Sequence, residues 1–152
     1  MKSKALIAVL VLLALVAVAT LSAAPLTREE AIRRTRELAD SNGFHTVSLR
    51  ELVGILETAK GNIQAVMKCA LAVATHGSNT PIIVALASTV AQQETDVAHF
   101  DELLVIAMLH QTESLRIQRD LQDYVGGRIT IEQLRRRVEP SLYPVLVSGS
   151  LR

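Results

Sequence analysis

The chain has 152 residues and a net charge of +1, which argues against a nucleic-acid-binding or polybasic membrane-surface protein. A single cysteine, Cys69, excludes a scaffold held by intrachain disulfides. Aromatic residues make up 3% of the sequence, which disfavours sugar or single-stranded nucleic-acid sites because these depend on aromatic platforms.

The N-terminal segment has the layout of a secretory signal peptide. Lys2 and Lys4 precede the apolar run 5–19, and small residues follow as far as Ala24. Residues 5–24 carry no charge and are long enough to cross a bilayer, so an uncleaved anchor is the alternative. Both interpretations place the remaining chain outside the cytoplasm. We expect a leader or anchor at 1–23, a helical domain at 24–140 and a tail at 141–152.

Three capping boxes mark predicted helix starts. They are Thr27-Arg28-Glu29-Glu30, Ser48-Leu49-Arg50-Glu51 and Thr130-Ile131-Glu132-Gln133. In this motif the hydroxyl and the residue three positions later satisfy free N–H groups at the helix start. The boxes predict helices over 28–39, from 48 to about 59, and from 130 to just before Pro140. Val47 and Leu52 flank the second box as an expected hydrophobic staple.

The middle of the chain predicts three further helices. We expect Asn62 to cap a helix over 63–75 and Thr80-Pro81 to open the next segment. No glycine or further proline occurs between Pro81 and Tyr124. This stretch is either one long helix or two helices that separate at residues 93–96. We favour the separation, because polar residues cluster there and so long a helix is unusual in a small domain.

The predicted fold class is all-α, a compact bundle of five or six helices, because no segment shows sustained alternation of apolar and polar residues. Residues 82–87 and 103–109 are apolar on every side, which predicts burial inside the bundle or an assembly. Cys69 lies in a similar apolar run and is expected to be a buried small hydrophobe. The tail 141–152 is expected to be loose or docked.

Two histidine–carboxylate pairs form a candidate metal or acid–base site. His99 and Glu102 are three residues apart, as are His110 and Glu113. Both pairs would share one stripe of one helix. Di-metal sites in helical bundles also use histidine and carboxylate at this spacing, but in the reverse order and from different helices. We therefore favour solvated polar positions on an amphipathic helix over metal ligands.

A second candidate metal site comprises Asp40, Asn42 and Glu51. The segment 40–51 resembles an EF-hand calcium loop, and this resemblance would give the three residues ligand positions. Phe44 replaces a further ligand, and His45 stands where the sharp turn of that loop requires glycine. The capping box within this segment accounts for the same residues without calcium.

The sequence contains none of the usual nucleophile, phosphate-loop or zinc-protease motifs, and no cofactor is indicated. We expect a non-enzymatic domain that binds a protein partner or assembles with itself. A carrier of small apolar ligands, with a cavity between helices, is the alternative. A metal-dependent enzyme or an EF-hand-like module ranks third. Membrane contact is expected only through an uncleaved N-terminal segment.

Overall fold

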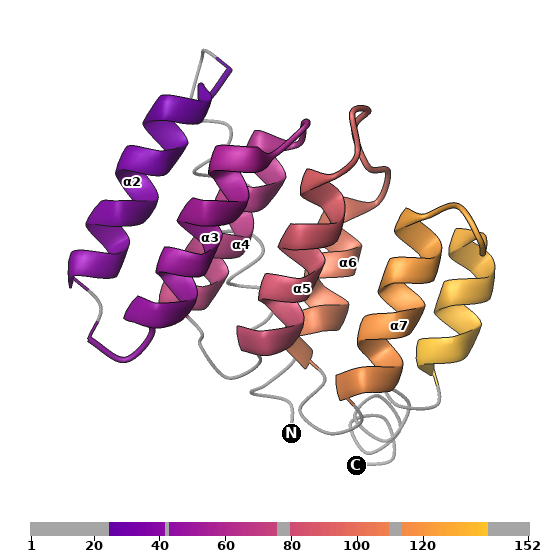
Figure 1. Cartoon of the computed structure of the whole chain (residues 1–152). Helices are drawn as coiled ribbons and strands as arrows, with labels where there is room; N and C mark the ends of the chain where they lie inside the picture. Colours follow the sequence, from indigo (N-terminus) through magenta and orange to yellow (C-terminus); the bar gives the residue numbers. More distant parts are fainter. Residues whose placement is uncertain (1–24, 42, 76–79, 110–113, 140–152) are drawn as a thin grey trace.

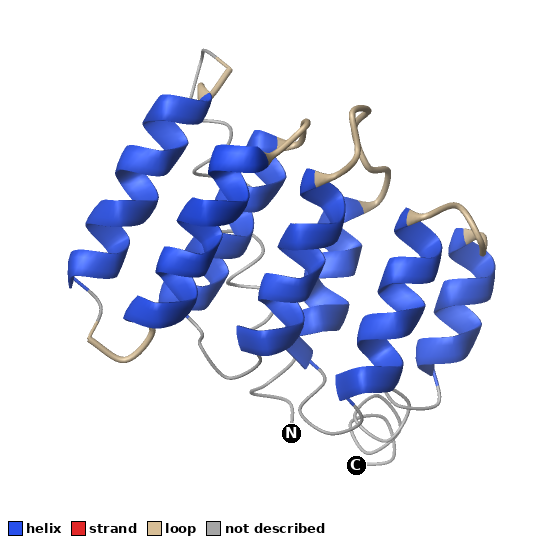
Figure 2. Cartoon of the chain, in the orientation of Figure 1, coloured by secondary structure: helices blue, strands red, loops and turns tan. Residues whose placement is uncertain are grey.

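A computed structural model of the chain describes residues 25–41, 43–75, 80–109 and 114–139 (Figure 1). Within these ranges every regular element is an α-helix and no strand occurs (Figure 2). The prediction of an all-α fold is therefore confirmed. The predicted leader or anchor at 1–23 and the tail at 141–152 lie outside the described residues.

The described residues form seven helices, one more than the larger number expected from the sequence. Six of them are α2 (Arg28–Ser41), α3 (Thr46–Thr58), α4 (Ile63–Thr75), α5 (Thr80–Ala91), α6 (Phe100–Leu109) and α7 (Ser114–Val125). The seventh spans residues 131–139. Three antiparallel hairpins result, namely α3 with α4, α5 with α6, and α7 with the helix 131–139, while α2 precedes the first (Figure 1).

The hairpins lie side by side in two layers. The front layer in Figure 1 contains α3, α5 and α7, which run in the same direction, and α4 and α6 lie behind them. α2 packs against both helices of the first hairpin. Each helix therefore packs mainly against its near neighbours along the chain, as in proteins made of stacked helix pairs.

The core lies between the two layers and is mainly aliphatic. Its largest fully buried side chains include Leu52 and Leu56 of α3, Ile83 of α5, Leu104 of α6 and Leu121 of α7. The runs 82–87 and 103–109 are mostly buried, as predicted, with only partial exposure at some positions. Burying one such side chain contributes about 1.5–3 kcal/mol, so packing between the layers holds the hairpins together.

Two of the predicted helix caps are confirmed. At the start of α2, the Glu30 N–H donates to the Thr27 hydroxyl oxygen at 3.2 Å. Before the helix 131–139, the Thr130 N–H donates to Gln133 Oε1 at 2.9 Å, and the Gln133 N–H donates to Thr130 Oγ1 at 3.2 Å. The second pair is a complete capping box, with both side chains bonded reciprocally.

The capping box predicted at Ser48 is wrong. α3 begins at Thr46, and its N-cap His45 makes no side-chain hydrogen bond to the helix. The Thr46 hydroxyl donates instead to the Ala39 carbonyl oxygen of α2 at 3.1 Å. This contact ties the start of α3 to the end of α2. Val47 is 73% exposed, so the predicted hydrophobic staple does not form.

The helix boundaries in the second half of the chain are partly as predicted. α5 ends at Ala91 and α6 begins at Phe100, which confirms the separation at 93–96 and rules out one long helix. α6 then ends at Leu109 and α7 begins at Ser114. This second boundary was not predicted, because no glycine or proline marks it, and it accounts for the additional helix.

The loop after α3 is joined by hydrogen bonds to the end of α5 and to the loop that follows it, and we call this contact the hairpin junction. Asn62 Nδ2 lies 2.9 Å from the Val90 carbonyl oxygen, 3.1 Å from that of Gln93 and 3.0 Å from that of Thr95. Asn62 Oδ1 accepts the Val97 N–H at 3.3 Å. Asn62 precedes α4 as predicted, but these bonds connect its side chain to the next hairpin.

Backbone geometry at the hairpin junction requires its particular residues. Asn62 has a φ of 57°, a left-handed conformation that asparagine tolerates better than most residues. A Cβ atom at Gly61 would lie 2.7 Å from the Gln93 carbonyl oxygen, so only glycine permits this approach. The Lys60 N–H donates to the Ala91 carbonyl oxygen at 2.7 Å. The junction therefore fixes the first two hairpins relative to each other.

Cys69 is completely buried in α4, which confirms its interpretation as a core residue. Burial raises the pKa of its thiol well above the usual range, so the reactive thiolate does not form at neutral pH.

None of the helices in the described ranges combines the length and apolar character needed to cross a bilayer.

Candidate interaction groove

A groove runs along the front layer between α3, α5 and α7, with a volume of about 690 Å³. From α3 it is lined by Ser48, Glu51, Gly54, Ile55 and Thr58. Their spacing of mostly three or four residues places them on one face of the helix. The three helices hold this face in position because their opposite sides pack into the core.

Small side chains create the hollow. Gly54 contributes no side chain from α3, and Ala85 and Ser88 line the groove from α5. A Cβ atom at Gly54 would meet no other atom within 4 Å. Glycine in a helix interior costs about 0.5–1 kcal/mol relative to alanine. Gly54 therefore keeps the groove open although it lowers the stability of α3, and no close packing contact requires it.

The wall of the groove is largely uncharged. Glu51 is the one charged side chain among the described residues that line it. Thr58 and Ser88 bring hydroxyl groups, and Gln118 of α7 brings an amide. The groove thus offers apolar contact area, a few neutral hydrogen-bonding groups and one carboxylate.

Three large apolar side chains are exposed near the beginnings of α3 and α7, although none of them belongs to the residues that line the groove. Val47 is 73% exposed and lies one turn before Glu51, and Leu115 is 74% exposed and lies one turn before Gln118. Phe44, just before α3, is 95% exposed. We call these three residues the apolar rim. Exposed apolar side chains are typical of an interaction surface where they form a contiguous patch.

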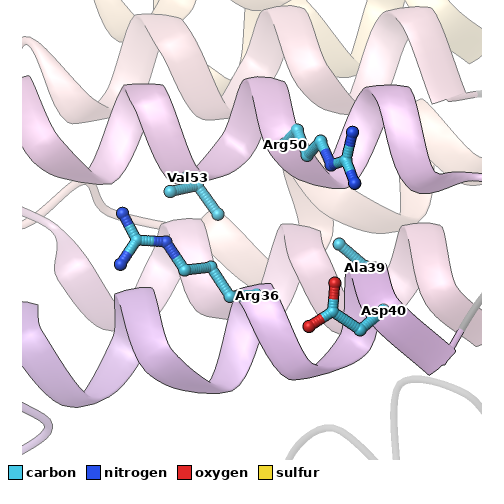
Figure 3. A pocket seen from close by; sticks show the side chains of 5 residues that line it. All are labelled: Arg36, Ala39, Asp40, Arg50 and Val53. Atoms are coloured by element: carbon cyan, nitrogen blue, oxygen red, sulfur yellow. The ribbon is translucent and has the colours of Figure 1, made fainter.

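A second, smaller hollow of about 280 Å³ lies between α2 and α3. Figure 3 shows its lining side chains, which are Arg36, Ala39 and Asp40 from α2 and Arg50 and Val53 from α3. Arg36 is bonded to Glu57 at 3.2 Å. Two arginines and one carboxylate do not resemble the oxygen-rich environment of a calcium ion.

The structure separates the candidate calcium ligands. Asp40 lines the hollow between α2 and α3, whereas Glu51 lines the groove. Asn42 lies outside the described residues. Throughout the described part of the chain, no group of three or more histidine, cysteine or acidic side chains is placed to hold a metal ion.

Of the two histidine–carboxylate pairs, the structure describes His99 and Glu102, while His110 and Glu113 lie outside the described residues. His99 Nδ1 is 3.9 Å from Glu102 Oε2. Both carboxylate oxygens of Glu102 accept hydrogen bonds from Arg135, at 2.9 and 3.0 Å. The bonds from Arg135 hold the pKa of Glu102 below its ordinary value. Glu102 therefore links α6 to the helix 131–139.

Tyr124 completes this polar cluster at the third hairpin. Its hydroxyl donates to the Ala98 carbonyl oxygen at 3.2 Å, and its ring lies 6.4 Å from that of His99, edge to face. Burial raises the pKa of the Tyr124 hydroxyl. These contacts connect the loop after α5 with α7, so the cluster has a structural role.

Sequence reasoning missed the groove. Its only clear signal is Gly54, a glycine within an otherwise good helical pattern. The matching small residues, Ala85 and Ser88, are separated from it by an entire helix, so the groove becomes visible only when α3 and α5 are placed side by side.

Comparisons of the chain with protein-family models, curated proteins and solved structures found no match.

Proposed function

We propose that this chain is an exported helical domain that acts by binding a protein partner through the groove. The observation that carries the proposal is an open, largely uncharged groove on a molecule that also exposes the large apolar side chains of the apolar rim. Val47 and Glu51 share a stripe of α3, and Leu115 and Gln118 share a stripe of α7. Gly54 adds support because packing does not require it.

The chemistry of the groove favours an extended peptide segment as its ligand. Ala85 and Ser88 leave room for an incoming chain, and the rim can bury apolar side chains of the partner. Burying an exposed Val, Leu or Phe contributes about 1.5–3 kcal/mol. A carrier of small apolar ligands would need a pocket that encloses most of the ligand, whereas this groove is open to solvent. Self-assembly is the same mode of binding with a second copy as partner.

Selection from a random peptide display library tests this proposal. We expect the full chain to recover peptides rich in apolar residues and poor in acidic ones. Gly54→Arg should abolish their binding, because Gly54 lines the groove and a Cβ atom there has open space, so the larger side chain projects into the groove. Gln64→Arg, on an exposed position of α4, adds the same charge elsewhere and should leave binding unchanged. Equal binding by both variants would refute the proposal.

Export is tested separately. Lys2, Lys4 and the apolar run 5–19 support it. Expression with the native leader, cell fractionation and N-terminal sequencing should yield an extracytoplasmic product, shortened if the leader is cleaved. Full-length product found only in the cytoplasm would contradict export and would leave the groove proposal unaffected.

A further inference from the structure

We infer that the groove selects a peptide with a basic side chain, which pairs with Glu51, and an apolar side chain two positions away, which fills the space beside Gly54. The inference rests on the proposed function, because it assumes that the groove accepts an extended peptide. Glu51 and Gly54 both line the groove and are exposed, and together they determine which peptides bind.

The charged side chains of α3 divide between two sides of the helix. Arg50 lines the hollow next to α2 together with Asp40 (Figure 3), and Glu57 is bonded to Arg36 of α2 at 3.2 Å. Both therefore lie beside opposite charges of α2. Glu51 lines the groove instead, and within the described part of the chain no residue forms an ion pair or hydrogen bond with its carboxylate.

The rest of the groove wall supplies no positive charge to Glu51. α5 contains no charged residue, and α7 contributes the neutral Gln118. A wholly apolar peptide would cover Glu51 without compensating its charge, which is costly. An acidic peptide would add repulsion. A basic side chain removes both costs, and arginine fits best because its guanidinium can bond both oxygens of a carboxylate.

The spacing of the two side chains follows from the geometry of α3. A helix advances about 1.5 Å per residue, so Gly54 lies about 4.5 Å beyond Glu51 and Thr58 about 10.5 Å beyond it. In an extended peptide, side chains on one face repeat about every 6.6 Å. A side chain two positions from the basic residue therefore lies over the turn that begins at Gly54, where a Cβ atom would meet nothing within 4 Å.

Binding measurements with a library-selected peptide test the role of Glu51. The peptide is compared with a counterpart in which glutamate replaces its basic residue. We expect the parent chain to bind the basic form at least about tenfold more tightly, and Glu51→Lys to reverse this preference. Glu51→Gln should weaken binding of the basic form about two- to fivefold, the effect of one exposed ion pair.

A matched control places the same charge change on another exposed glutamate. Glu29→Lys, on α2, should leave the preference for the basic peptide intact. Circular dichroism should show the same helix content for all variants, because both glutamates are exposed. If Glu29→Lys reverses the preference as Glu51→Lys does, the net charge of the molecule and not the groove selects the peptide, and the inference is overturned.

A shift in the peptide tests the spacing. Moving the apolar residue by one position relative to the basic residue should weaken binding at least about tenfold, because its side chain then points away from the groove. Equal binding of the shifted peptide, or an unchanged preference in Glu51→Lys, would overturn the inference. If Gly54→Arg still abolishes peptide binding in that case, the proposed function stands and this inference alone is wrong.

Sedimentation of the parent chain tests the competing occupant, a second copy of the protein. We expect a monomer over the concentration range of the binding measurements. Concentration-dependent association that Gly54→Arg abolishes would make the second copy the occupant and would overturn the inference.

Discussion

Gly61 at the hairpin junction and Gly54 in the groove are both glycines on or just after α3, yet their surroundings differ completely. A Cβ atom at Gly61 would lie 2.7 Å from the Gln93 carbonyl oxygen, whereas one at Gly54 would meet nothing within 4 Å. The fold needs the first glycine because two loops touch there. Packing does not require the second glycine, Gly54, so we relate this residue to ligand binding in the groove.

The largest effect is expected at the junction itself. Asn62→Ala removes the hydrogen bonds to the end of α5 and the loop after it, and leaves the carbonyl groups there without these partners. A net contribution of about 1 kcal/mol for each bond gives a destabilisation of about 2–4 kcal/mol. Chemical denaturation measures it. A loss below about 0.5 kcal/mol would mean that water replaces these bonds and that the junction does not hold the hairpins.

Alanine at the two glycines tests the comparison most simply, because the expected signs are opposite. Gly61→Ala should destabilise the protein by about 1–3 kcal/mol, since the backbone must move to avoid the clash. Gly54→Ala should stabilise it by about 0.5–1 kcal/mol, because alanine favours the helix and has open space before it. Thermal melts of both variants measure the difference. The same sign for both would show that Gly54 also has a packing role.

A smaller effect separates the true helix cap from the apparent one. Thr130→Ala removes a side-chain hydrogen bond at the start of the helix 131–139 and should cost about 0.5–2 kcal/mol. Ser48 lies inside the first turn of α3, so Ser48→Ala should change stability by less than about 0.5 kcal/mol. Equal losses of stability for Thr130→Ala and Ser48→Ala in denaturation experiments would show that Ser48 does cap α3.

The smallest effect concerns pH. Hydrogen bonds from Arg135 lower the pKa of Glu102 below 4.5 in the folded protein. The resulting stabilisation is fully present above the unfolded value near 4.5 and is lost as pH falls through the lower folded pKa. Glu102→Gln should therefore reduce stability at pH 7 and flatten its decline below pH 4.5. Melts across this range measure the slope, and an unchanged slope would exclude the contribution. Partial exposure of the pair keeps the effect modest.

Sequence patterns located most helices but not the contacts between them. Thr130 and Ser48 open similar motifs, yet only Thr130 caps a helix. Near Ser48, α3 begins earlier, at Thr46, whose hydroxyl is bonded to Ala39 of the preceding helix. The boundary between Leu109 and Ser114 had no local signal either. Local motifs thus predict a helix end only where no tertiary contact overrides them.

The candidate sites show the same limit. The spacing of His99 and Glu102 predicted their proximity, but the bidentate bond from Arg135 joins residues far apart in the chain. Asp40 and Glu51 are eleven positions apart in sequence and line separate hollows. The groove depends on the alignment of α3, α5 and α7, which no local pattern encodes.

Amide chemical-shift mapping of the full chain with a library-selected peptide tests the central claim most directly. The claim predicts that the shifts concentrate at residues that line the groove, such as Gly54, Ala85 and Gln118. Gln64 on α4 and Arg36 beside the smaller hollow should not move. Shifts centred on α4, or on the hollow between α2 and α3, would contradict the assignment of the groove as the binding surface.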